Sequence, residues 1–319
     1  MSTDTLPWPA PTSLAGFLLG IIFVLVTNFV IQTFNSFTGL LLFLFLPLCC
    51  AVTLSSVIYA LFSCNIALYF APTFRCRDLD ARGFRKNLAI ALCLGGTFAC
   101  SLLLVSHAFR VLENPRIVWP FGVYLAFLTF FHWSEFFITA LTSPLRADID
   151  SYMLVHSPEY LAAVALSFAE YWLGMWLWPT KATNYLWINL AGLLICIAGE
   201  SLRKVAMWTA ADNFSHFVEH TLRREHQLVR SGVYAWCRHP AYVGWFFWSL
   251  GTQLLLANPL CSIVYPLAAY AFFRDRVYSE EQSLVAFFGE AYRSYQREVG
   301  TGLPFIRGYV DKNEDGDYR

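Results

Sequence analysis

Eight long apolar stretches dominate this sequence and determine the solvent in which it can fold. They lie near residues 14–33, 38–60, 87–109, 117–141, 158–178, 185–202, 240–257 and 259–273. All are long enough, or nearly so, for the roughly 20 residues that a helix needs to cross the hydrocarbon core of a bilayer, and the last two are short. Only 14% of the residues are charged, whereas soluble domains carry about 25%. We therefore expect an all-α integral membrane protein with about eight transmembrane helices, the last two joined by a tight turn at Asn258-Pro259.

Lysine and arginine are distributed unequally between the connecting segments. If the N-terminus lies in the cytosol, all basic residues but Arg110, Arg116 and Lys181 fall on the cytosolic side of the predicted spans. Cytosolic loops of membrane proteins carry such an excess. The sequence thus predicts an even number of spans with both termini in the cytosol.

The segment 226–242 is polar and rich in loop-forming residues, although it lies beside the last two apolar stretches. Ionisable residues at the edge of a membrane are costly enough that a functional site is the first hypothesis for them. Pro240 suits the first turn of a helix, so Arg238 and His239 would lie at a helix N-terminus, which favours an anion such as a carboxylate or phosphate. The alternative is that this Arg-His pair only anchors the helix at the headgroup level.

Arg276 and Glu280 are four residues apart in a segment, 272–288, whose apolar spacing is helical. They would therefore share one helical face. Such a pair is usually a surface ion pair of little energetic value. Here the segment directly continues the last apolar stretch, so it can fold back against residues 226–242.

Ionisable residues also occur within or at the ends of other predicted spans. His132 and Glu135 are three residues apart, and Glu159, Glu170 and Glu200 lie in later spans. Paired with one another or with arginine they would hold helices together. Alternatively they line a pocket that faces the bilayer, or the ion path of a transporter.

Two patterns bear on metal binding. His216-Phe217-Val218-Glu219-His220 matches the H-x-x-E-H pattern of a zinc peptidase family. No third ligand stands out, and the alternative is an amphipathic cytosolic helix. The nine cysteines lie mostly in apolar runs without C-x-x-C spacing, which indicates small buried side chains. We expect no metal.

A series of short motifs runs from about residue 130 to residue 308. They include His132-Trp133-Ser134-Glu135, Gly199-Glu200, Leu202-Arg203-Lys204, Ala206-Met207, His226-Gln227-Leu228-Val229, Gly232-Val233-Tyr234, Arg238-His239-Pro240, Tyr242-Val243-Gly244-Trp245, Gly251-Thr252-Gln253, Asn258-Pro259, Phe272-Phe273-Arg274-Asp275-Arg276, Glu280-Glu281, Phe287-Phe288-Gly289 and Thr301-Gly302-Leu303-Pro304-Phe305-Ile306. In this order they resemble the isoprenylcysteine carboxyl methyltransferase family. The first 70 or so residues match that family only in hydropathy.

The resemblance implies an eight-span enzyme of the endoplasmic reticulum membrane, with its active site and both termini in the cytosol. It implies methylation of the carboxylate of a C-terminal prenylated cysteine, with S-adenosyl-L-methionine as methyl donor. Partners would be the lipid bilayer and prenylated proteins such as small GTPases, and no nucleic acid. We also expect a C-terminal cytosolic helix that caps the cofactor pocket.

The resemblance assigns site residues by motif. Arg276 would be the catalytic residue on the substrate side. His132 and Glu135 would also bind substrate if they line a pocket that faces the bilayer. Arg238 joins the donor site through its place at the predicted helix N-terminus. Two positions depart from the family pattern, since Glu219 stands where Gln is frequent and Ala241 where Ser is common. The expected cofactor-binding residues are Glu219, His226, Gln227, Leu228, Val229, Tyr234, Arg238, His239, Pro240, Ala241, Tyr242 and Glu280.

The domain organisation that follows has four parts. Residues 1–75 would form N-terminal transmembrane helices, 76–205 the central helices, 206–308 the cofactor-binding and catalytic region with its helical hairpin, and 309–319 a disordered tail. Alternative functions are a phospholipid methyltransferase, which shares the donor, and a sterol reductase, which uses NADPH. A transporter is a third class, in which Arg276 and Glu280 would tolerate substitution.

Overall fold

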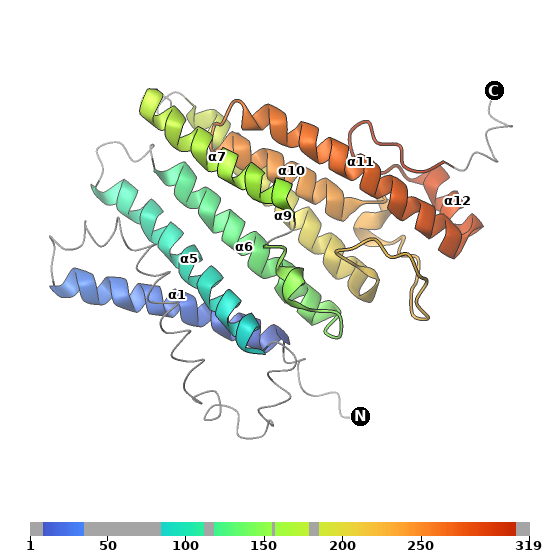
Figure 1. The fold of residues 1–319 in the computed structure, drawn as a ribbon, viewed down its shortest axis with the longest axis horizontal. Coiled ribbons are helices and arrows are strands. Elements are labelled where there is room, and N and C mark those ends of the chain that lie inside the picture. Colours follow the sequence, from blue (N-terminus) through green and yellow to red (C-terminus); the bar gives the residue numbers. More distant parts are fainter. Residues whose placement is uncertain (1–8, 35–83, 112–117, 155–156, 179–184, 311–319) are drawn as a thin grey trace, which may run out of the picture. The chain divides into compact units, whose positions relative to one another are not determined.

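Helices are the only regular elements in the part of the chain that the structure describes. A computed structural model describes residues 9–34, 84–111, 118–154, 157–178 and 185–310 (Figure 1). The all-α prediction is confirmed for these residues. The α-helices are α1 (Pro9–Phe34), α5 (Phe84–Val111), α6 (Trp119–Thr142), α7 (Pro158–Leu177), α9 (Leu186–Ala210), α10 (Pro240–Leu255), α11 (Cys261–Phe288) and α12 (Glu290–Glu298), and the 3-10 turns are η2 (Ile149–Tyr152), η3 (Ala211–Asn213) and η4 (Gly232–Ala235).

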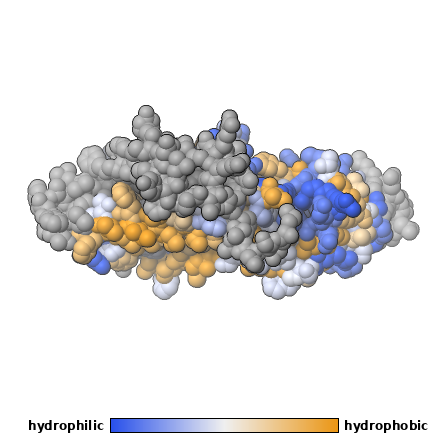
Figure 2. Space-filling view, turned by 90° about the horizontal axis from the view of Figure 1, so that it is seen from below, coloured by the Kyte–Doolittle hydropathy of each residue, from blue (hydrophilic) through white to orange (hydrophobic). Residues whose placement is uncertain are grey.

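Four of the described helices are long and apolar enough to cross a bilayer. They are Pro9–Phe29 in α1, Lys86–Arg110 in α5, Trp119–Thr142 in α6 and Pro158–Leu177 in α7. The predicted span 38–60 lies outside the described residues. Many large apolar side chains are exposed, and Figure 2 shows hydrophobic residues over a broad area of one face, as a bilayer requires.

The last two predicted spans form a helical hairpin. Helix α10 has 16 residues and is therefore about 24 Å long, which is shorter than the hydrocarbon core of about 30 Å. Helix α11 is a single 28-residue helix, so the predicted continuation of the last span into the segment of Arg276 and Glu280 is confirmed. By length and composition alone neither helix qualifies as a span, because α10 is too short and α11 carries too many charged residues. A total of eight spans therefore stays a prediction.

The chain contacts divide the protein into two compact units, residues 1–162 with 175–186 and residues 163–174 with 187–319. In the first unit α1 packs closely on α5, because a Cβ at Gly20 would lie 2.2 Å from the carbonyl oxygen of Leu92. Trp133 of α6 stacks on Phe17 of α1 with ring centroids 4.2 Å apart. The hydroxyl of the buried Tyr152 donates to the Asn87 carboxamide oxygen at 2.5 Å.

In the second unit, α9 and α10 approach each other through glycines. A Cβ at Gly199 of α9 would lie 2.5 Å from the backbone nitrogen of Trp248, and one at Gly244 of α10 would lie 2.6 Å from the carbonyl oxygen of Gly199. Small residues permit such close backbone contact between helices in membranes. The contact fixes the position of α10, whose first turn carries the polar residues predicted to bind the cofactor.

We expect Gly199→Ala to destabilise the protein by about 1–3 kcal/mol, because the added methyl group must push α9 away from α10. Chemical unfolding of the detergent-purified protein measures this change. Gly300→Ala is the matched control, since a Cβ at Gly300 meets nothing within 4 Å, and it should leave stability unchanged. Equal stability of both variants would show that the glycine contact does not hold the two helices.

Polar side chains fix the turn between α10 and α11. The Glu170 carboxylate accepts hydrogen bonds from the backbone nitrogens of Leu260 (2.7 Å) and Cys261 (2.8 Å) at the start of α11. Asn258 donates to the carbonyl oxygen of Ser167 at 3.0 Å. A carboxylate is stabilising at a helix N-terminus. Glu170 therefore holds helices together, which is one of the roles that the sequence left open for it.

Candidate active site

A polar loop connects α9 to α10, and it differs from the predicted helix. Residues 214–231 contain no helix, so the prediction of a helix over His216–His220 is wrong. Short polar side chains bond the backbone here instead, since Asn213 Oδ1 accepts from Gln227 N at 2.8 Å and Ser215 Oγ accepts from Phe217 N at 3.2 Å. Such bonds compete with helix formation. Because the segment is not helical, His216 and His220 do not share the face that a zinc peptidase site needs.

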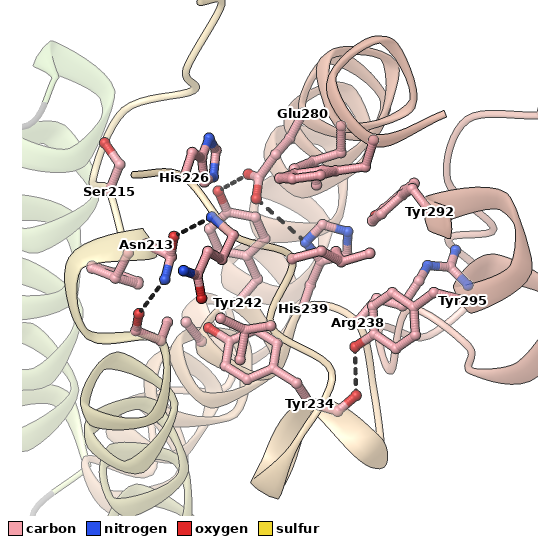
Figure 3. A pocket seen from close by; sticks show the side chains of 18 residues that line it. Asn213, Ser215, His226, Tyr234, Arg238, His239, Tyr242, Glu280, Tyr292 and Tyr295 are labelled. Carbon is pink, nitrogen blue, oxygen red and sulfur yellow. Dashed lines mark hydrogen bonds and ion pairs between the residues drawn. The ribbon is translucent and has the colours of Figure 1, made fainter. Parts of the chain in front are cut away.

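A pocket lies between this loop, the start of α10, and helices α11 and α12 (Figure 3). It holds about 650 Å³ of empty space, part of it open to solvent. Both apolar and polar side chains line it, and three aromatic side chains come from α11 and α12. The lining residues are Ala210, Asn213, Phe214, Ser215, His226, Gln227, Leu228, Val229, Tyr234, Arg238, His239, Ala241, Tyr242, Glu280, Leu284, Phe288, Tyr292 and Tyr295.

A hydrogen-bonded chain on one wall of the pocket joins Arg276, Tyr242 and Glu280. Arg276 Nε donates to the Tyr242 hydroxyl at 2.8 Å, and that hydroxyl donates to Glu280 Oε2. A second N–H group of Arg276 donates to the carbonyl oxygen of His216, which fixes the plane of the guanidinium. The ring of His239 stacks on Tyr242 with centroids 5.5 Å apart. The Arg276 guanidinium is thus held at the pocket wall by the Tyr242 hydroxyl, which accepts a hydrogen bond from Arg276 and donates one to Glu280.

The floor of the pocket rests on a buried carboxylate, Glu281, whose side chain is fully buried. It accepts from Arg238 Nε at 2.7 Å and from His239 Nε2 at 3.0 Å. The same oxygen, Oε1, accepts from the Tyr292 hydroxyl, and Oε2 accepts from Gln296 and from the backbone nitrogen of Tyr309. Glu281 therefore joins the start of α10 to α11, to α12 and to the C-terminal segment.

The guanidinium of Arg238 also joins the start of α10 to α12 and to the C-terminal segment. In addition to its bond to Glu281, it donates to the carbonyl oxygens of Gln296 (3.2 Å), Val299 and Arg307 (3.0 Å). Its side chain is 4% exposed. All three nitrogens of the guanidinium are thus engaged within the protein, so Arg238 positions the pocket rather than presenting a free cation to it.

Comparison with known proteins places this site in a family. The model of the isoprenylcysteine carboxyl methyltransferase family matches residues 191–286. Protein-S-isoprenylcysteine O-methyltransferase of Rattus norvegicus is 46% identical over 246 residues, which are 76% of this chain and 84% of the rat protein. This chain belongs to the isoprenylcysteine carboxyl methyltransferase family.

Further relatives agree with this assignment. The protein-S-isoprenylcysteine O-methyltransferase of Saccharomyces cerevisiae is 38% identical over 191 residues, which are 58% of this chain and 80% of the yeast protein. A solved structure of the eukaryotic intramembrane Ras methyltransferase, an isoprenylcysteine carboxyl methyltransferase, has a TM-score of 0.76 and 34% sequence identity. The match covers 95% of this chain and 99% of that one. The family predicted from the motifs is confirmed, and with it a helical, multi-pass membrane enzyme of the methyltransferase class.

The pocket gathers most of the residues that were predicted from the sequence to bind the cofactor. The lining includes His226, Gln227, Leu228, Val229, Tyr234, Arg238, His239, Ala241, Tyr242 and Glu280. Of the remaining two, Pro240 is the buried first residue of α10, and Glu219 lies on the loop and pairs with Arg223 at 3.9 Å. Neither lines the pocket.

The two substrate-side residues assigned to α6 belong to the other compact unit. There His132 Nδ1 donates to the carbonyl oxygen of Tyr152 at 2.8 Å, so that Nε2, at 2.9 Å, accepts from the Tyr160 hydroxyl. Both ring nitrogens thus have partners. Glu135 is fully buried within α6. Arg276, the third substrate-side residue, contacts the pocket wall through Tyr242.

Several pocket residues were not anticipated. Tyr292 and Tyr295 come from α12, which follows Gly289 at a φ of 54°, and Tyr295 donates to the carbonyl oxygen of Tyr234 at 2.5 Å. Asn213 lies just beyond α9. The spacing of the two tyrosines, three apart on a short helix, signals a shared face, but nothing in the sequence indicates what that face covers.

The pKa of Glu281 makes stability depend on pH in a defined direction. Burial alone would raise this pKa, but hydrogen bonds and charge from His239 and Arg238 outweigh it and hold the pKa at about 2. In the unfolded chain a glutamate titrates near pH 4.3. Since the folded pKa is the lower one, the stabilisation is complete above about pH 5 and is lost as the pH falls toward 2. Unfolding midpoints between pH 7 and 3 should therefore fall more steeply for the wild type than for Glu281→Gln, and parallel curves would contradict this.

Proposed function

We propose that this chain transfers a methyl group from S-adenosyl-L-methionine to the α-carboxylate of a C-terminal S-prenylated cysteine. The observation that carries the proposal is the pocket on α9 to α12, whose wall connects through Tyr242 to Arg276. A phospholipid methyltransferase, an NADPH-dependent sterol reductase and a transporter are less favoured, because the family model matches residues 191–286, which include most of the pocket lining.

The pocket suits a polar, nucleoside-sized donor. Polar and aromatic side chains line it together, and the rings of Phe214, Phe288 and Tyr295 offer faces for a flat purine. When bound, the donor supplies a methyl group on a positively charged sulfur. Glu280 is the residue we assign to the donor's ammonium group or ribose hydroxyls, since its carboxylate is 29% exposed at the pocket wall.

The loop residues His226, Gln227, Leu228 and Val229 form another wall for the donor. We assign Arg238 and His239 an indirect role, because their bonds to Glu281 hold the α10 N-terminus in place. The α12 residues Tyr292 and Tyr295 support the proposal that a C-terminal helix caps the donor. Glu219 stays a proposed donor residue that would need the loop to move toward the pocket.

Arg276 is the residue we assign to the acceptor carboxylate. A guanidinium matches a carboxylate with two parallel N–H groups, and no described residue bonds its Nη1. The acceptor needs no general base, because an α-carboxylate has a pKa of about 3.3–3.7 and is ionised at neutral pH. A carboxylate oxygen forms the new C–O bond, the S–CH3 bond breaks, and its electron pair stays on sulfur. Holding the two reactants in line can lower the barrier by about 7–11 kcal/mol.

A membrane setting explains how both reactants reach such a site. Each buried CH2 of a prenyl chain gains about 0.8 kcal/mol in hydrocarbon, so the acceptor should enter laterally from the bilayer. The donor is polar and should enter from water. We therefore propose prenylated proteins, small GTPases among them, as substrates at a site on the cytosolic face of the endoplasmic reticulum membrane. Glu135 stays a proposed substrate-side residue, whereas the two bonds of His132 favour a role in packing.

One assay tests this function. Detergent-purified protein is mixed with methyl-labelled S-adenosyl-L-methionine and N-acetyl-S-farnesyl-cysteine, and base-labile methyl ester is counted. Ester formation is the expected result. Donor binding without ester, together with label in phosphatidylethanolamine, would instead identify a phospholipid methyltransferase, and the absence of donor binding would overturn the methyltransferase proposal.

A further inference from the structure

A second hollow lies along α11, separate from the pocket of the active site. It holds about 880 Å³ of empty space, part of it open to solvent. It shares no lining residue with the first pocket. We name it the interfacial groove, and its lining residues are Tyr270, Arg274, Asp275, Tyr278, Phe305, Ile306, Arg307 and Gly308.

The groove lies where α11 changes from apolar to charged. Residues 261–273 of this helix carry no charge, and Arg274 is the first of a charged series. Tyr270 and Tyr278 lie on either side of that boundary, and Tyr278 is 50% exposed. Tyrosines gather at the headgroup level of membranes because one end of the ring is apolar and the other polar. The groove is thus placed at the boundary between bilayer and water.

Phe305, which lines the groove, has an unusually exposed side chain and an unusual backbone conformation. Its side chain is 93% exposed, and its φ of 61° is in the left-handed region that non-glycine residues rarely adopt. The loop around it is firmly held, since Leu303 and Ile306 are buried in the same core cluster as Val277 and Thr301 donates to the carbonyl oxygen of Ile306 at 2.5 Å. A rigid, strained loop that presents a phenyl ring outward indicates an apolar environment that none of the described residues provides.

Two arginines give the groove its charge. Arg274 and Arg307 are both exposed. Arg274 Nε donates to Asp275 at 2.9 Å, and the Arg307 guanidinium forms no ion pair with any residue that the structure describes. Arginine offers several donors to a phosphate. Asp275 offsets one of the two positive charges, so it should weaken anion binding rather than abolish it.

We infer that the interfacial groove binds the headgroup of an anionic phospholipid. The lipid phosphate would lie against Arg274 and Arg307, with Tyr270 and Tyr278 beside the glycerol region and the ring of Phe305 among the acyl chains. Anionic leaflets attract basic residues near a membrane surface, by about five-fold in affinity for each residue. This site is distinct from the proposed methyl transfer and does not depend on it.

Native mass spectrometry of the full-length protein tests the inference. The protein is released from detergent micelles that contain equal amounts of phosphatidylserine and phosphatidylcholine, and retained lipids are counted. Wild type is expected to retain phosphatidylserine in preference. The double variant Arg274→Gln/Arg307→Gln should lower that retention by about 25-fold, whereas Arg297→Gln, which removes one exposed charge from α12, should not. Asp275→Asn should raise retention, a gain that misfolding would not produce.

Three results would overturn the inference. Equal retention of the two lipids by the wild type would remove the headgroup preference. Unchanged phosphatidylserine retention in both the double variant and Asp275→Asn would place any preference elsewhere on the surface. Displacement of phosphatidylserine by millimolar inorganic phosphate would show a site for a free anion instead of a lipid.

Discussion

Replacing Arg276 with alanine is expected to lower kcat/KM for a prenylcysteine acceptor by about 100- to 1,000-fold, because truncating one partner of a buried, hydrogen-bonded charge pair costs about 2–5 kcal/mol of binding. The guanidinium is held by Tyr242 and by the backbone of His216, so its orientation is set before the acceptor arrives. Arg276 does not line the donor pocket, and donor affinity should change little. Initial rates and calorimetric titration of the donor measure the two effects separately.

Two companion variants sharpen this test. Arg276→Lys keeps the charge but loses the planar fork, so its activity should fall between those of the wild type and the alanine variant. Arg297→Ala removes an exposed arginine from α12 and should leave activity unchanged. If Arg276→Ala lost donor affinity while kcat stayed near the wild-type value, Arg276 would belong to the donor site instead.

Local sequence signals predicted those parts of the fold that depend on local geometry. Pro240 correctly marked the start of α10, because proline suits a first turn. Asn258 correctly marked the hairpin turn. The spacing of Arg276 and Glu280 correctly placed both on one helix, since residues four apart share a face. The loop at His216 was mispredicted because its backbone bonds come from Asn213 and from Arg276, which is distant in sequence.

The roles of the paired glutamates illustrate what sequence alone does not reveal. Consecutive residues on a helix point about 100° apart, so Glu280 and Glu281 must face different surroundings. Glu280 lines the pocket, whereas Glu281 is fully buried under it. Which of the two faces the pocket depends on how α11 packs against α10 and α12. The family resemblance supplied the choice of Glu280, but neither it nor the spacing indicated that Glu281 and Arg238 hold the site together.

Glu281→Gln should destabilise the second unit strongly, by about 3–5 kcal/mol. The change leaves the Arg238 guanidinium buried without its counter-charge, and the side chains of the pair are only 4% and 0% exposed. Glu281 also accepts from Gln296 and from the backbone of Tyr309, and an amide nitrogen in place of a carboxylate oxygen meets a donor there. Chemical unfolding of the detergent-purified protein measures the loss.

The same substitution should weaken donor binding even where the protein remains folded, because His239 loses its partner and the first turn of α10 is released. Glu290→Gln is the matched control, since Glu290 is exposed on α12 and pairs with Arg297 at the surface, and its unfolding curve should match that of the wild type. Replacing both members of the buried pair, as Arg238→Met with Glu281→Leu, should recover part of the stability but not the donor affinity, since burying an unpaired charge costs more than burying none. If the double variant were as unstable as Glu281→Gln, the loss would come from the bonds to α12 and Tyr309 rather than from the ion pair.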